Sequence, residues 1–169
     1  MLDDLTNLQA LLKDSTLLAT RGYIAGEWCD GENGKTFPVF NPARGDVITD
    51  VADISRTQTA EAISIAEKAQ KLWAARPAKE RSNLLRNWYN LMMENQEDLA
   101  TILTAEQGKP IEEAKGEIAY GASFIEFFAE EAKRVYGETI PGHQSDKRIT
   151  VLKQPVGVAA SITPWNFPN

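Results

Sequence analysis

The chain has 169 residues, 43% of them hydrophobic and 25% charged, a composition typical of a globular protein that buries its core without disulfides or metals. Its 18 Lys and Arg residues against 24 Asp and Glu residues give a net charge of −6, which argues against nucleic acid as a partner, since phosphate backbones are bound by basic surfaces. No uncharged apolar run approaches the ~20 residues of a membrane span, the N-terminus carries Asp3 and Asp4 rather than a basic leader, and one cysteine suits a reducing compartment, so we expect a cytoplasmic protein without membrane contact.

Residues 1–20 are predicted to form a helical arm. Leucines recur along one side of this segment at helical spacing, namely Leu2, Leu5, Leu8, Leu11 and Leu12. Because a short isolated helix is only marginally stable in water, we expect the arm to dock on the rest of the chain.

Residues 21–53 carry strand and turn signals. Residues 22–28 are typical of a strand with a tight turn, and the Gly-containing run 30–34 is a turn cluster. Residues 37–41 and 47–51 are short strand candidates, separated by an Asn-Pro turn and Gly45. A small antiparallel sheet is therefore predicted here.

Three helices are predicted between residues 55 and 136. Ser55 and Gln58 match a capping box at the start of the first helix, and Pro77 is expected to end that helix and begin the next. The second is predicted to run without a break to Gly108. The third has apolar residues on two faces and is expected between two layers. Its Gly116 and Gly121 are expected to allow the close approach of another backbone, and its glutamates, such as Glu117, to form mostly a solvated face.

Two strands are predicted after the third helix. Residues 149–154 alternate apolar and polar side chains, which indicates a half-buried strand. Residues 156–162 are almost continuously apolar, which is typical of a strand covered on both faces in a parallel sheet. Such a strand needs neighbours that no later residues supply, and we therefore expect the sequence to be the N-terminal part of a longer protein.

Four segments resemble the aldehyde dehydrogenase family. They are Asn-Pro-Ala at 41–43, Glu-Gln-Gly-Lys-Pro at 106–110, Glu-Ala-Lys-Gly-Glu-Ile at 113–118 and Thr-Pro-Trp-Asn-Phe-Pro at 163–168. Residues 86–93 and 127–141 are most similar to the succinate-semialdehyde dehydrogenase branch, with glutarate-semialdehyde dehydrogenases as close relatives that could share them.

The resemblance implies an α/β fold, of which this chain holds the N-terminal part of the dinucleotide-binding domain. Residues 1–20 would be the helical arm, and residues 21–142 the strands and helices of the cofactor-binding domain. Residues 143–155 would belong to an oligomerisation flap, and residues 156–169 would be the first strand and loop of the dinucleotide-binding sheet. The flap implies a homodimer or homotetramer for the full-length enzyme.

The resemblance also implies oxidation of succinate semialdehyde to succinate with NAD or NADP, through a cysteine thiohemiacetal and a thioester. The alternative within the family is a glutarate-semialdehyde dehydrogenase or another aldehyde dehydrogenase. Asn166 matches the family's side-chain donor of the oxyanion hole. An amide suits this task because it donates a hydrogen bond without titrating. Taken without the resemblance, an Asn in such a loop would be a turn residue bonded to its own backbone.

The remaining site residues border the cofactor and the substrate. Ile162, Thr163, Pro164 and Trp165 match the end of the strand beside the nicotinamide, where open α/β sheets bind ligands. Phe167 matches a position beside the substrate channel, with core packing as its alternative. Phe124 and Phe128 could line the same channel, although core packing is the preferred interpretation for both.

The family's nucleophile, general base, phosphate-binding turns and carboxylate-binding residue have no counterpart in these 169 residues. Cys29 lies in an N-terminal turn region without cationic neighbours and is interpreted as a bystander, and His143 as a loop residue without a metal. We therefore expect the fragment alone to be inactive. The alternative from another class is a short, non-catalytic protein that docks on a full-length subunit.

Overall fold

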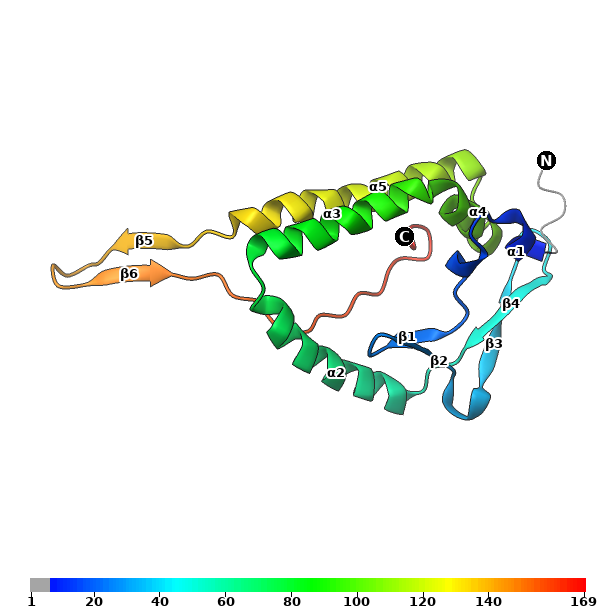
Figure 1. Ribbon diagram of the computed structural model, residues 1–169, viewed down its shortest axis with the longest axis horizontal. Coiled ribbons are helices and arrows are strands. Elements are labelled where there is room, and N and C mark those ends of the chain that lie inside the picture. The colour runs from blue at the N-terminus through cyan, green and yellow to red at the C-terminus, as the bar shows by residue number, and fades with distance from the viewer. Residues whose placement is uncertain (1–6) are drawn as a thin grey trace.

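The computed structural model describes residues 7–169, and its N-terminal segment is irregular (Figure 1). Helix α1 covers only Leu8–Leu11 and the 3₁₀ turn η2 covers Ser15–Leu17, so the predicted helical arm is wrong for the described part. The backbone N–H groups of Lys13 and Asp14 donate to the Asp98 carboxylate instead of continuing a helix. Leu8 and Leu12 are nevertheless buried, against Ala105, so the segment docks as expected; Leu2 and Leu5 lie outside the described residues.

Two antiparallel hairpins follow, as two separate sheets rather than one. Strands β1 (Gly22–Ile24) and β2 (Glu27–Cys29) are joined by Ala25 and Gly26, both with positive φ, which is the backbone geometry of a tight primed turn. After the 3₁₀ turn η3 (Glu32–Gly34), β3 (Thr36–Phe40) pairs with β4 (Val47–Ala52). The predicted strand positions are confirmed in this region.

Four α-helices form the middle of the chain: α2 (Arg56–Ala74), α3 (Ala78–Glu94), α4 (Gln96–Gln107) and α5 (Ile111–Glu131), which is extended by the 3₁₀ turn η4 (Ala132–Arg134). The prediction of one continuous helix up to Gly108 is wrong, because the chain leaves the helix at Asn95, whose side-chain amide donates to the Leu91 carbonyl oxygen. Gly108 ends α4 with a φ of 81°, as predicted.

The core lies where α3, α4 and α5 pack together. Ala100 and Leu103 of α4 meet Ala114 and Ile118 of α5, and small residues on this face of α5 let the helices approach closely. The opposite face of α5 is open, with Phe124 and Phe128 about half exposed. The prediction that α5 lies between two layers is therefore wrong for this chain.

The segment after α5 and η4 extends from the helices and then returns. Strands β5 (Glu138–Pro141) and β6 (Arg148–Val151) form a hairpin that projects beyond α3 and α5 (Figure 1). Residues 152–163 run back without secondary structure, and the strand predicted over residues 156–162 is absent. Val156 and Ile162 are 98% and 97% exposed, because no strand in the described chain pairs with this segment. No helix in residues 7–169 is long and apolar enough to cross a membrane.

The capping box that starts α2 gives a first test of local stability. The Ser55 hydroxyl accepts from the Gln58 N–H, and the Gln58 side chain accepts from the Ser55 N–H. We expect Ser55→Ala to lower the free energy of unfolding by about 1 kcal/mol, because it leaves a helix N–H without its acceptor. Denaturant titration measures this, and Ser123→Ala on the exposed face of α5 is the control, expected to change little. Equal stability of the two variants would contradict the prediction.

Candidate functional site

The segment with the most predicted site residues, residues 162–167, is an exposed run that ends in a turn. The Phe167 N–H donates to the Pro164 carbonyl oxygen at 3.2 Å and closes the turn. Ile162, Trp165 and Phe167 all expose much of their side chains. The structure thus brings the predicted cofactor and oxyanion residues together on one exposed loop.

Lys109 anchors this loop through its side chain. It follows the left-handed cap at Gly108, and its ammonium Nζ donates to the backbone oxygen of Asn166 at 2.9 Å. The same ammonium lies 4.2 Å from the ring centroid of Phe167, within the range of a cation–π contact. The backbone of Asn166 is therefore fixed by Lys109, and Asn166 itself is an exposed residue.

Glu117 of α5 completes the anchor. Its carboxylate pairs with Lys109 through Oε2 and accepts from the Asn169 N–H through Oε1 at 3.0 Å. The Glu117 side chain is only 2% exposed, so its assignment to a solvated face is wrong. Helical spacing alone did not reveal this, although Lys109 and Glu117 both lie in the motifs at 106–110 and 113–118.

Asn169 reaches α5 where that helix has no side chain. A Cβ atom at Gly121 would lie 2.2 Å from Nδ2 of Asn169, so a larger residue at position 121 would displace the Asn169 side chain from this contact. The close approach expected at Gly121 is thus made mainly by a side chain, with the Asn169 backbone oxygen at 3.5 Å. The close approach expected at Gly116 is wrong for the described chain, because nothing lies within 4 Å of such an atom there.

A small hollow of about 190 Å³ lies beside the end of the loop. It is lined by side chains of α4 and α5 together with Pro168 and Asn169. Glu106 also lines it, and burial raises the pKa of the Glu106 carboxyl above its ordinary value. Glu106 as a residue remains exposed, and the other residues that line this hollow are mostly apolar, namely Leu99, Ile102, Leu103 and Ile118.

The two predicted channel residues of α5 lie in a different hollow. Phe124 and Phe128 line a space of about 440 Å³ together with Tyr120, Ser123 and Phe127. The rings of Tyr120 and Phe124 meet edge to face at 4.9 Å. Core packing is wrong for Phe124 and Phe128 in this chain, since both are about half exposed. The structure does not bring them into one hollow with Phe167.

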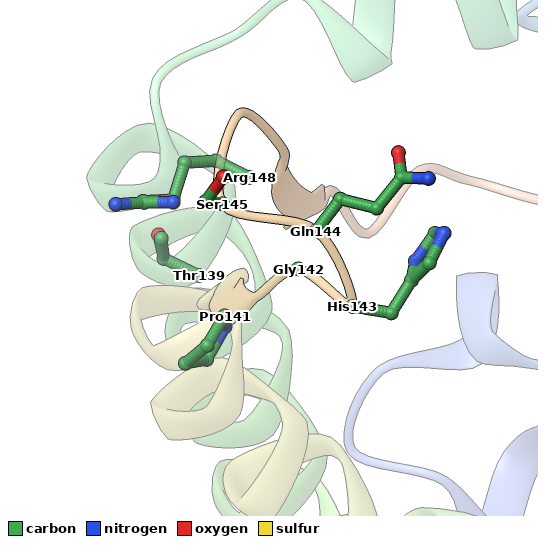
Figure 2. Close-up of a pocket in the computed structure, with 7 residues that line it drawn as sticks. All are labelled: Thr139, Pro141, Gly142, His143, Gln144, Ser145 and Arg148. Carbon is green, nitrogen blue, oxygen red and sulfur yellow. The ribbon is translucent and has the colours of Figure 1, made fainter.

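A hollow of about 560 Å³ lies at the tip of the β5–β6 hairpin (Figure 2). His143 and Gln144 extend to one side of the tip, whereas Arg148, Ser145 and Thr139 lie on the other. These polar groups do not converge on one point, and no group of three or more His, Cys, Asp or Glu residues suited to a metal occurs in the described part of the chain. His143 is a loop residue, as predicted, and Cys29 ends β2 opposite Gly22.

Comparison with known proteins identifies what this chain resembles. The model of the aldehyde dehydrogenase family matches residues 28–169. A glutarate-semialdehyde dehydrogenase of Pseudomonas putida is 61% identical over 157 residues, and an NADP(+) succinate-semialdehyde dehydrogenase of Escherichia coli is 58% identical over 157 residues. Each match covers 93% of this chain and 33% of the relative.

A solved structure agrees with the sequence matches. The crystal structure of an E. coli NADP-dependent enzyme superposes with a TM-score of 0.90 at 58% sequence identity. The superposition covers 93% of this chain and 33% of the E. coli chain. The chain thus spans about a third of the length of the relatives it matches. The helices, hairpins and C-terminal loop described above are shared with an α/β enzyme fold.

Proposed function

The chain belongs to the aldehyde dehydrogenase family, and from this premise we propose that it supplies the oxyanion-hole loop and one wall of the cofactor site for NAD(P)-dependent oxidation of a semialdehyde. The observation that carries the proposal is the anchored turn around Asn166. Its backbone is held by Lys109, and Asn166 is an exposed residue that a substrate oxygen can approach.

Asn166 has a defined task in this reaction. Attack of a cysteine thiolate on an aldehyde places negative charge on the former carbonyl oxygen. A carboxamide N–H donates to that oxygen and stabilises the charge as it develops, without losing a proton itself. We propose that the thiolate belongs to a segment outside these 169 residues, since Cys29 lies at the end of β2, opposite Gly22 in the β1–β2 hairpin.

The residues before Asn166 suit one wall of a nicotinamide site. Ile162 and Trp165 offer exposed apolar surface of the kind that covers a flat ring, and Thr163 adds a hydroxyl group. NAD or NADP, when bound, accepts the hydride. We assign residues 162–166 to this wall, and Phe167, Phe124 and Phe128 to the substrate side.

The proposed substrate is succinate semialdehyde or glutarate semialdehyde. Support comes from the names of the relatives, which are 61% and 58% identical to this chain and differ in this substrate. The single cysteine supports a cytoplasmic location.

Steady-state kinetics of the complete gene product that carries this sequence test the proposal. We expect NAD(P)-dependent oxidation of one of the two semialdehydes, with kcat/KM in the range of ordinary enzymes, about 10⁴–10⁸ M⁻¹s⁻¹. The purified 169-residue polypeptide is expected to give no turnover, because its one cysteine lies in β2. An inactive complete product, or an active 169-residue polypeptide, would contradict the proposal.

We further propose that the β5–β6 hairpin mediates a homodimer or homotetramer. All residues of both strands are exposed, and Ile140 and Ile149 form a cross-strand apolar pair on one face. We expect Ile149→Asp to convert the complete gene product to monomers, because a carboxylate cannot be buried unpaired in an interface. Thr150→Asp on the other face is the control. Light-scattering mass measures the result, and an unchanged oligomer in Ile149→Asp would sink the idea.

A further inference from the structure

The ion pair between Lys109 and Glu117 differs from the surface pairs of this chain. Its side chains are 10% and 2% exposed, whereas those of Arg21 and Asp30 are 49% and 67% exposed. Removing two charges from water costs free energy that their attraction often fails to repay. Burial of the Lys109–Glu117 pair is therefore weak evidence that the pair stabilises the fold. The other contacts of the two side chains indicate the role of the pair.

Within residues 7–169, the further polar contacts of the two charged groups go to the C-terminal loop. Lys109 Nζ donates to the Asn166 oxygen and lies over the Phe167 ring. Glu117 Oε1 accepts from the Asn169 N–H. The pair thus holds residues 166 and 169 at two points, and the Pro164–Phe167 hydrogen bond closes the turn before them.

We propose that Lys109 and Glu117 are positioning residues that orient Asn166 for its work on the substrate oxygen; the proposal rests on the function assigned to Asn166 above. Fixing the carbonyl of residue 166 and the ring of residue 167 leaves the carboxamide only its own side-chain torsions. An oxyanion donor acts only when it is held within a fraction of an ångström of its working position. The pair supplies that restraint through the backbone of Asn166, the ring of Phe167 and the N–H of Asn169.

Hydrogen exchange tests the restraint directly in the complete gene product. We expect Lys109→Met and Glu117→Gln to speed exchange of the Phe167 and Asn169 amides by about tenfold or more, because the loop opens locally once its anchor is removed. The matched control is Lys115→Met, on the same helix α5 as Glu117. This substitution removes the ion pairs of Lys115 with Glu97 and Glu112 and leaves the Lys109–Glu117 pair intact. Unchanged exchange in both anchor variants would overturn the proposal.

Kinetics separate positioning from a merely structural role. We expect Lys109→Met to lower kcat about tenfold with KM within twofold, since a small misplacement of a catalytic group costs rate rather than ground-state binding. Lys109→Arg keeps the charge and is expected to restore most of the rate. In an Asn166→Ala background, Lys109→Met should add no further loss.

The double variant and Asn166→Ala alone distinguish the positioning role of Lys109 from the oxyanion role of Asn166. An additional tenfold loss in the Asn166→Ala background would overturn positioning, because the lysine would then act independently of Asn166. If Asn166→Ala alone leaves kcat unchanged, the proposed role of Asn166 fails. Faster exchange in Lys109→Met would then still establish the anchor itself.

Discussion

Asn166→Ala in the complete gene product is expected to lower kcat by about 10²–10³-fold, which is the usual cost of losing one oxyanion donor. The physical reason is that alanine leaves the negatively charged oxygen of the tetrahedral adduct without the carboxamide donor of this loop. The backbone contact to Lys109 is made by the residue 166 carbonyl, so the loop conformation should survive the substitution. The measurement is the steady-state rate with the better of the two semialdehydes.

Two further variants sharpen this experiment. Asn166→Asp is expected to be at least as slow as Asn166→Ala, because a carboxylate accepts rather than donates and repels the developing charge. Asn90→Ala on the exposed face of α3 is the control and should leave kcat unchanged. A rate for Asn166→Ala within twofold of the unsubstituted enzyme would refute the assigned role.

Asp98→Ala is expected to have the largest effect on stability, a loss of about 2–3 kcal/mol in the free energy of unfolding. The Asp98 carboxylate is buried and accepts from the N–H groups of Lys13 and Asp14 at 3.1 and 2.8 Å. Removing it leaves two donors without their charged acceptor and releases the segment that carries Leu8 and Leu12 from α4. Denaturant-induced unfolding measures the loss.

The controls for Asp98→Ala separate charge from position. Asp98→Asn keeps one acceptor oxygen and should lose less stability than Asp98→Ala. Glu97→Ala changes the neighbouring acidic residue of the first turn, whose side chain is largely exposed, and should cost well under 1 kcal/mol. If Asp98→Ala is no more destabilising than Glu97→Ala, the docking role of Asp98 is wrong.

The parts of the fold that followed from sequence are those specified by neighbouring residues. Ser55 and Gln58 bond to each other across one helical turn, and Gly108 caps α4 because glycine adopts positive φ without strain. The break at Asn95 did not follow, since leucines continue at helical spacing on both sides of it. The helical arm predicted from the leucines did not follow either, because the backbone N–H of Lys13 donates to Asp98, 85 residues further along the chain.

In the candidate site, too, the sequence identified some residues, whereas contacts between distant segments decided the placement of others. Asn166 and its neighbours were identified by their resemblance to a family, and the structure places them on one exposed loop. Glu117 was misplaced because helical periodicity defines faces without saying which face another segment will cover. Its burial depends on Lys109 and on Asn169, the latter 52 residues further along the chain.

The contact between Asp98 and the N-terminal segment also bears on how the chain is made. Lys13 is synthesised 85 residues before its acceptor, so at about 5–20 residues per second the segment waits roughly 4–17 s for its partner. During that interval Leu8 and Leu12 have no α4 surface to cover them. Nascent chains of this protein therefore present a short leucine-rich stretch that chaperones can bind, and they bury it only once α4 has been synthesised.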